Sequence, residues 1–347
     1  MADKETAKRS RRSSGAITLR DVAKLAGVAP ITASRALNTP DQVSEVVLKK
    51  VKEAVERTGY VPNRLAGGLA SARSRLIAAI VPSTVISVFN ETIEALNGTL
   101  FDAGYQLMLG QSGYSPARAE MLLEAVIGRR PDGIFITGIL PPGKARTRLL
   151  ASGIPVVETW DLTPTPIDML VGFSHSQIGH DVAQFFSKKG CRHLAIVRAE
   201  DERADRRTRA FIEAAATYGL GGVHVENVGA LRTLRSGRQA LANVLAAKPQ
   251  VDAVFCSSDL LAMGVLTEAR VRHISVPEQL SVMGFGDVPF VADMVPALST
   301  VRINGAQIGQ IAARNLMDRA EGRGVAQPMV DVGFSIIERD STAQGKP

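Results

Sequence analysis

The chain has 347 residues, of which 45% are hydrophobic and 22% charged, and its formal net charge is +7. This length is too great for one ordinary hydrophobic core and is typical of two or three domains. The longest apolar run is broken by Pro82 and is too short to span a bilayer. The two cysteines form neither a disulfide framework nor a metal-binding pattern. We expect no signal peptide in the polar start of the chain, and therefore a cytoplasmic protein.

The positive charge is concentrated at the amino-terminal end. Residues 1–75 hold 15 of the 41 Lys and Arg residues and 7 of the 34 Asp and Glu residues, a net charge of +8. The remaining residues have a net charge of −1. A basic tail alone is often only solvated surface. A compact basic module ahead of a neutral body favours a polyanionic partner, most often nucleic acid.

Residues 1–16 are predicted to be a disordered basic tail, and residues 17–60 a small domain of three short helices. In the first helix, Thr18 can cap the free amides together with Asp21. This helix is expected to turn Leu25 inward and to end just before a glycine.

The second helix is predicted to begin at Pro30 and to end near Leu37, and the third to run from Ser44 to Thr58. The first two, joined by a tight turn, have the pattern of a helix-turn-helix, whose second helix enters a DNA groove about 12 Å wide. The alternative is an ordinary helical hairpin. It is less favoured, because this module is basic and lies at the amino-terminal end of the chain. The side chains expected to meet DNA are Thr18, Pro30, Ile31, Thr32, Ser34, Arg35, Asn38 and Tyr60.

From residue 76 onward, short β-branched runs alternate with helical stretches. This alternation predicts parallel sheets with helices on both faces, and because it occurs twice it indicates two similar α/β lobes. The last strands, "LSTVRIN" and "VDVGFSII", could cross back between the lobes.

The amino-terminal segments "TLRDVAKLAGVAPITASRALN" and "VSEVVLKKVKEAVERTGYVPNRLAGGLAS" resemble the signature of the lactose-repressor/galactose-repressor (LacI/GalR) family of transcriptional regulators. The remainder resembles the periplasmic-binding-protein-like core of that family. This resemblance implies that Pro30, Ile31 and Arg35 read bases. It also shows a departure, because Ala29 stands where the family usually has a capping Ser or Thr. Four segments look most like gluconate-operon repressors: "PSTVISVFNETIEAL", "GYQLMLGQSGYSP", "IPVVETWD" and "VDAVFCSSDLLAMG".

Residues 61–75 are predicted to be a hinge between the helical domain and the core, residues 76–347. Gly67 and Gly68 each cost a helix about 1 kcal/mol relative to Ala, so a short helix here should not persist alone in water. The resemblance implies that paired hinge helices form on DNA. The residues that it assigns to DNA are Asn63, Arg64, Ala66 and the minor-groove wedge Leu69. The alternative is a flexible linker.

A ligand cleft is expected where the strands of the two lobes end. Arg207 matches the family's ligand-binding arginine and suits a carboxylate or a vicinal diol. The alternative is that it belongs to a solvated, charged helix start. Two departures from the family's pattern are Gly286, in place of an aspartate, and Ser258, in place of an asparagine. The full predicted effector set is Ser83, Phe89, Gln111, Tyr114, Glu158, Trp160, Phe173, Arg207, Ser258, Asp259 and Asp287. For Trp160 and Phe173 the alternative is a place in the hydrophobic core.

An enzyme is the less favoured interpretation, because the sequence has no Walker A motif and no Gly-x-Gly-x-x-Gly at a strand-helix turn. His175, His180 and His193 lack a metal-binding spacing. No metal, cofactor or membrane partner is therefore expected. The prediction is a homodimeric repressor on palindromic operator DNA, controlled by a sugar acid or sugar phosphate. The alternative is a sugar-binding protein without a regulatory role.

Overall fold

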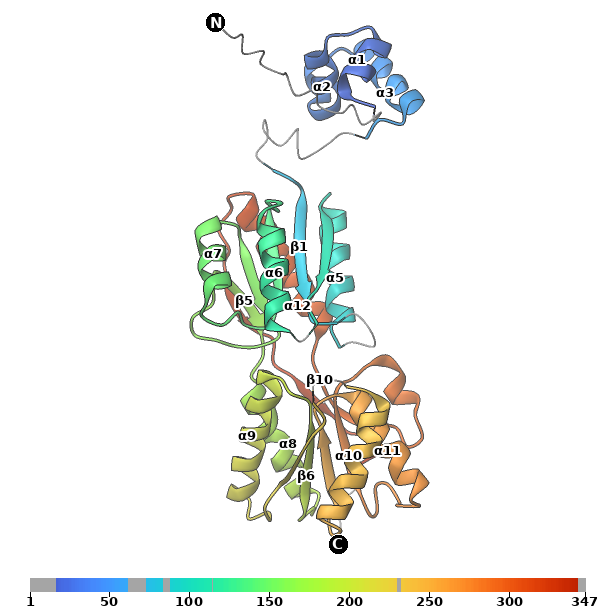
Figure 1. The fold of residues 1–347 in the computed structure, drawn as a ribbon, viewed down its shortest axis with the longest axis vertical. Coiled ribbons are helices and arrows are strands. Elements are labelled where there is room, and N and C mark those ends of the chain that lie inside the picture. Colours follow the sequence, from blue (N-terminus) through green and yellow to red (C-terminus); the bar gives the residue numbers. More distant parts are fainter. Residues whose placement is uncertain (1–16, 62–72, 84–87, 114, 230–231, 343–347) are drawn as a thin grey trace, which may run out of the picture. The chain divides into compact units, whose positions relative to one another are not determined.

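The computed structural model describes residues 17–61, 73–83, 88–113, 115–229 and 232–342, and the chain divides into two compact units, residues 1–74 and 75–347 (Figure 1). None of the helices within these ranges is long and apolar enough to cross a membrane. The predicted tail, residues 1–16, lies outside the described residues.

The first unit is a bundle of three α-helices with one short 3-10 helix. Val22, Ala33 and Val51, one from each α-helix, are fully buried and pack into a single small core. Leu25 was expected in this core but is 43% exposed, because it lies off the inward stripe of its helix. The helices are α1 (Leu19–Ala26), α2 (Pro30–Asn38), η1 (Pro40–Gln42) and α3 (Glu45–Thr58).

Local signals in the sequence set the helix ends of this unit. The backbone N–H and the hydroxyl of Thr18 both donate to the Asp21 carboxylate, at 2.8 and 2.7 Å, and these bonds lower the pKa of that carboxyl. Helix α1 ends at Gly27 and helix α3 at Gly59, both with φ near +65°, a conformation in which a side chain would be strained.

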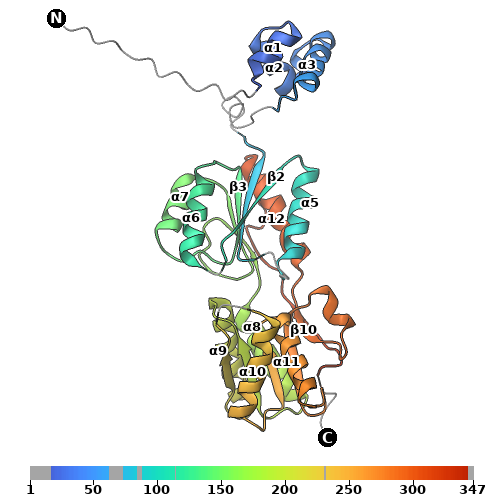
Figure 2. The same ribbon diagram turned by 45° about the vertical axis from the view of Figure 1, so that its right-hand side comes forward.

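The second unit begins with a lobe built on a six-stranded parallel sheet of order β11-β5-β4-β3-β1-β2. Helices α5 and α12 pack together on one face of this sheet, and α6 and α7 cover the other (Figure 2). The strands are β1 (Leu76–Val81), β2 (Gln106–Gln111), β3 (Gly133–Thr137), β4 (Val156–Thr159), β5 (Met169–Gly172) and β11 (Met329–Asp331). The helices are α5 (Asn90–Asp102), α6 (Pro116–Ile127), α7 (Lys144–Ser152) and α12 (Gly305–Ala320).

The second lobe repeats this design on a sheet of order β12-β10-β9-β8-β6-β7, with α8 and α9 on one face and α10 and α11 on the other. The other strand pairs of this sheet are parallel, as the sequence predicts, and the edge strand β12 is antiparallel to β10. The strands are β6 (Leu194–Arg198), β7 (His224–Asn227), β8 (Ala253–Cys256), β9 (Ser281–Gly286), β10 (Ser299–Arg302) and β12 (Ser335–Ile337). The helices are α8 (His175–Lys188), α9 (Glu202–Thr217), α10 (Leu234–Ala247), α11 (Asp259–Val271) and η2 (Pro289–Asp293).

The chain passes between the lobes three times: after β5, after β10, and between β11 and β12. The segment "VDVGFSII" therefore crosses between the lobes as predicted. The segment "LSTVRIN" also crosses at its end, because β10 lies in the second lobe and Ile303 and Asn304 lead on to α12 in the first. The two cysteines, Cys191 and Cys256, are not joined in a disulfide and are fully buried in the hydrophobic core.

Helices α8 and α9 approach each other closely at Gly179. A Cβ atom placed on this glycine would lie 2.2 Å from the carbonyl oxygen of Arg207, so no larger residue fits without moving a backbone. This contact fixes how the start of α8 faces the first turns of α9. His175 and Arg207 lie in those two places.

Candidate functional site

A cavity of about 550 Å³ lies between the two lobes, at the carboxyl ends of their strands. Residues after β1, β2 and β4 line it from the first lobe, and residues around the starts of α8, α9 and α11 line it from the second. Seven of the predicted effector residues line this cavity: Ser83, Phe89, Gln111, Trp160, Arg207, Ser258 and Asp259. Tyr114 lies outside the described residues.

Glu158 does not line the cavity. It is fully buried within β4, and its carboxylate accepts hydrogen bonds from the backbone N–H groups of Leu140 and Ile167, at 2.7 and 2.8 Å. Burial raises the pKa of this carboxyl, while the two N–H groups and Arg146, 3.6 Å away, act in the opposite direction. Glu158 therefore joins two loops of the first lobe, and its prediction as a cavity residue was wrong.

Phe173 and Asp287 are also placed elsewhere. Phe173 is fully buried, with its ring centroid 5.6 Å from that of Trp160, so it belongs to the core beneath the cavity. Asp287 turns away, and its carboxylate pairs with Arg302 and Arg339 at a separate hollow.

Arg207 is the most deeply buried cation of the cavity, with 4% of its surface exposed. Its Nη1 donates to Nδ1 of His175 at 2.8 Å, and its guanidinium carbon lies 4.1 Å from the ring centroid of Phe285. Within the described residues its buried Nε has no hydrogen-bond partner. Burial lowers the pKa of Arg207 to about 10, so the side chain stays positively charged at neutral pH.

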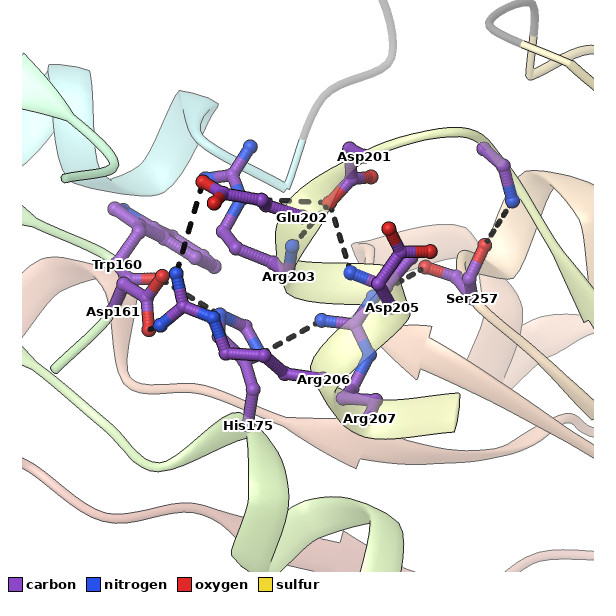
Figure 3. Close-up of polar contacts among 12 residues, drawn as sticks. Trp160, Asp161, His175, Asp201, Glu202, Arg203, Asp205, Arg206, Arg207 and Ser257 are labelled. Carbon is purple, nitrogen blue, oxygen red and sulfur yellow. Dashed lines mark hydrogen bonds and ion pairs between the residues drawn. The ribbon is translucent and has the colours of Figure 1, made fainter. Parts of the chain in front are cut away.

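Asp201 caps the start of α9 and binds two further arginines of the cavity; Figure 3 shows it beside one of them, Arg203. Its carboxylate accepts from the backbone N–H groups of Arg203 and Ala204, at 3.0 and 2.9 Å, and it forms ion pairs with the side chains of Arg203 and Arg232. Burial acts to raise the pKa of Asp201, but Arg203, Arg207 and Arg232 outweigh it and hold the value at about 2. This carboxylate is therefore charged at any physiological pH.

Asp259 is the second acid of the cavity. It accepts from the hydroxyl of Thr300 at 2.6 Å and from the backbone N–H of Val288 at 2.9 Å, and it is 2% exposed. Burial raises its pKa to about 6. Part of its negative charge is thus absent in mildly acidic conditions.

Together these side chains give the cavity an excess of positive charge. Four arginines line it, against the carboxylates of Asp201 and Asp259. The ring of Phe89 packs edge-on against Trp160, with centroids 4.8 Å apart, and provides an apolar wall. Such a cavity suits an anionic ligand that also has an apolar face.

Several cavity residues were not predicted from the sequence: Arg118, His175, Asp201, Arg203, Arg232 and Phe285. The motif "DERADRRTR" carries a signal for some of them, since Asp201 is an N-cap candidate that places Arg203 and Arg207 on one helix face. The sequence around His175 has no local pattern that predicts its place in the cavity. Across the described residues, no group of three or more His, Cys, Asp or Glu could hold a metal ion.

Helix α2 of the first unit presents the predicted DNA-reading side chains. Ile31 is 64% exposed, and Pro30, Arg35 and Asn38 are exposed beside it. Ala29 precedes the helix without a capping side chain, and Pro30 takes the first helical position, as the sequence indicated.

The other predicted DNA-contacting residues take several positions. Thr32, Ser34 and Tyr60 are half-buried, Thr18 is exposed at the start of α1, and four residues lie outside the described part of the chain: Asn63, Arg64, Ala66 and Leu69.

A helix-turn-helix unit in one chain with a two-lobed α/β core defines a DNA-binding regulator. The family "Bacterial regulatory proteins, lacI family" matches residues 18–63, and "Periplasmic binding protein-like domain" matches residues 183–342. The chain belongs to the LacI family of DNA-binding transcriptional regulators.

Individual relatives agree with this assignment over nearly the whole chain. The HTH-type transcriptional regulator GntR of Pseudomonas aeruginosa is 37% identical over 333 residues, which cover 95% of this chain and 97% of the relative. GntR of Escherichia coli is 31% identical over 319 residues, covering 92% and 96%. A LacI-family regulator from Silicibacter pomeroyi has a crystal structure with a TM-score of 0.88 and 32% identity, covering 94% and 100%. These relatives are transcriptional regulators rather than enzymes.

Proposed function

We propose that this regulator is a repressor whose affinity for a palindromic operator is controlled by a sugar acid, gluconate or a close relative or its phosphate. The observation that carries the proposal is the buried guanidinium of Arg207, surrounded by three further arginines in a cavity with an aromatic wall. A neutral sugar would leave this positive charge unbalanced, whereas a carboxylate or phosphate would neutralise it.

The remaining lining matches a polyhydroxylated chain. Ser83, Gln111 and Ser258 offer hydrogen-bonding groups from both lobes, and Asp259 can accept from a ligand hydroxyl. Phe89 and Trp160 suit the apolar C–H face of such a chain. Because the cavity draws its lining from both lobes, a bound effector favours the closed arrangement of the core.

The proposed control of DNA binding places two copies of the chain on the two half-sites of the operator, with a cytoplasmic location following from this function. Effector binding in the core would weaken the ordered hinge on DNA. A coupling free energy of about 1–3 kcal/mol would change operator affinity about 5- to 150-fold.

Isothermal titration calorimetry tests the effector class. Gluconate and 6-phosphogluconate are expected to bind, and neutral glucose is expected to bind far more weakly. The variant Arg207→Ala should lose affinity for both acids, because it removes the buried cation. Arg209→Ala, an exposed arginine on the same helix, is the matched control and should bind normally. Equal binding of glucose and gluconate would refute the anionic class.

Mobility-shift assays with DNA fragments selected from a random pool test the operator role. The variant Leu69→Ala should abolish specific binding, if this residue is the minor-groove wedge that the family resemblance implies. Its affinity for the effector should remain unchanged. Specific binding at the level of the unmodified protein would remove Leu69 from the proposed mechanism, and no preference for any selected fragment would contradict the repressor itself.

A further inference from the structure

We propose that His175 is a positioning residue that holds the Arg207 guanidinium ready for the anion and connects it to Trp160 in the other lobe. This inference rests on the proposed function for its ligand, but it is carried by contacts that exist without one. Figure 3 shows the imidazole of His175 between the guanidinium of Arg207 and the backbone of Trp160.

The two hydrogen bonds of His175 determine the state of its ring. Nη1 of Arg207 can only donate, so Nδ1 of His175 must accept at 2.8 Å. The carbonyl oxygen of Trp160 can only accept, so Nε2 of His175 must donate at 2.9 Å. The ring is therefore neutral, with its proton on Nε2, and both nitrogens are fully used.

The surroundings of the ring keep it in that state. His175 is 3% exposed, and its ring packs edge-on against Phe173 with centroids 4.8 Å apart. Burial, with the nearby charge of Arg207, lowers the pKa of His175 well below its ordinary value. A neutral imidazole can accept from Arg207 without repelling its charge, which a protonated imidazole could not do.

His175 leaves Arg207 partly unsatisfied. Nη1 is bound to the imidazole, and Nη2 makes a long contact of 3.5 Å with the carbonyl of Ser257. Within the described residues, Nε is the buried donor that remains without a partner. An arginine held by His175 and by the ring of Phe285 thus meets an incoming anion with little loss of side-chain freedom.

The second bond of His175 joins the lobes. His175 begins α8 in the second lobe, whereas Trp160 follows β4 in the first lobe. The indole Nε1–H of Trp160 continues the chain of bonds by donating to the hydroxyl of Thr92 on α5, at 3.2 Å. If a bound ligand shifts the side chain of Arg207, the movement can therefore be transmitted to α5 through the side chains of His175 and Trp160.

A neighbouring ion pair supports the same reading of this junction. Arg206, adjacent to Arg207, binds the carboxylate of Asp161, adjacent to Trp160, at 2.9 Å. Consecutive residues of α9 thus contact consecutive residues of the first lobe, and His175 mediates one of the two contacts. These two contacts hold the start of α9 in a fixed position against the first lobe, beside the proposed ligand site.

Two substitutions separate the two bonds of His175. The side chain of Asn can place an oxygen near the position of Nδ1, which preserves the acceptor for Arg207 but does not reach the Trp160 carbonyl. The longer Gln can place its N–H₂ near Nε2, which preserves the bond to Trp160 at the expense of the acceptor. His175→Phe removes both bonds while keeping an aromatic ring.

Calorimetry and fluorescence measure the two consequences. Trp160 is the only tryptophan of the chain, so its emission reports on this junction. We expect His175→Gln to bind 6-phosphogluconate about tenfold more weakly than His175→Asn, because a bond to a charged donor is lost. We expect His175→Asn to show the smaller ligand-induced change in emission. Equal affinities and equal emission changes in the two variants would overturn the proposal.

A double-mutant cycle in the ligand-free protein keeps the test independent of the proposed effector. Urea unfolding of His175→Phe, Arg207→Met and the double variant should reveal a coupling of about tenfold in the unfolding equilibrium constant. Additive effects would refute the positioning role even if sugar acids bind. If the coupling is clear but the protein binds no sugar acid, the positioning role of His175 is supported and the proposed effector class is rejected.

Discussion

The substitution Asp259→Asn should change how the stability of the core depends on pH. Burial raises the pKa of Asp259 from 3.8 to about 6 in the folded protein. Between these values the folded state binds more protons than the unfolded state, so this group lowers stability as pH rises. At about 1.4 kcal/mol for each pKa unit, the loss between pH 3 and pH 8 is about 3 kcal/mol.

An asparagine is neutral throughout this range and can preserve both hydrogen bonds. Its oxygen can accept from the N–H of Val288, and its N–H₂ can donate to the hydroxyl of Thr300, which then turns round. The free energy of unfolding of Asp259→Asn, relative to the unmodified protein, should therefore increase by about 3 kcal/mol between pH 3 and pH 8.

Urea unfolding at several pH values, followed by the emission of Trp160, measures this difference in the core alone. Asp293→Asn removes the same charge from an exposed position in the 3-10 helix η2 and serves as the control. A difference between Asp259→Asn and the unmodified protein that stays constant with pH would refute the assignment of a buried carboxyl with a raised pKa.

Three further substitutions test the packing and the sites. Gly179→Ala should lower the melting temperature of the core by several degrees, because its Cβ would lie 2.2 Å from a backbone oxygen, and an unchanged melting curve would contradict the close helix contact. Glu158→Gln should cost about 1–3 kcal/mol in urea unfolding by replacing one acceptor with a donor, while calorimetry should find effector affinity unchanged; a selective loss of affinity would return Glu158 to the cavity. Arg35→Ala should weaken operator binding by about 1–3 kcal/mol in mobility shifts, and equal weakening on unrelated DNA would show a phosphate contact instead of base reading.

The features that the sequence predicted best depend on local chemistry. The end of α1 at Gly27 and of α3 at Gly59 follows from the left-handed conformation that glycine accepts. The capping pair of Thr18 and Asp21 forms because the two residues are three positions apart on a helix start. The two α/β lobes were likewise predicted from the alternation of strands and helices, because strands and helices differ in the spacing of their hydrophobic residues.

The errors lie where a prediction needed the end of a strand or a distant contact. The sequence prediction places Glu158 just after its strand, but β4 continues to Thr159, so the carboxylate stays inside the lobe. His175 meets Arg207 across 32 positions in the sequence, and their distance depends on how α8 packs against α9. No pattern within a short window encodes that packing, so Arg207 was recognised without the residue that holds it.

The deep burial of both thiols has a practical consequence for following the motions of this regulator. Cys191 and Cys256 are fully buried, and burial raises the pKa of the Cys256 thiol, which suppresses the reactive thiolate. A cysteine introduced on the surface would therefore react with a maleimide dye or spin label ahead of the native pair. Distances between labelled positions could then be measured in the otherwise unaltered protein, with and without DNA.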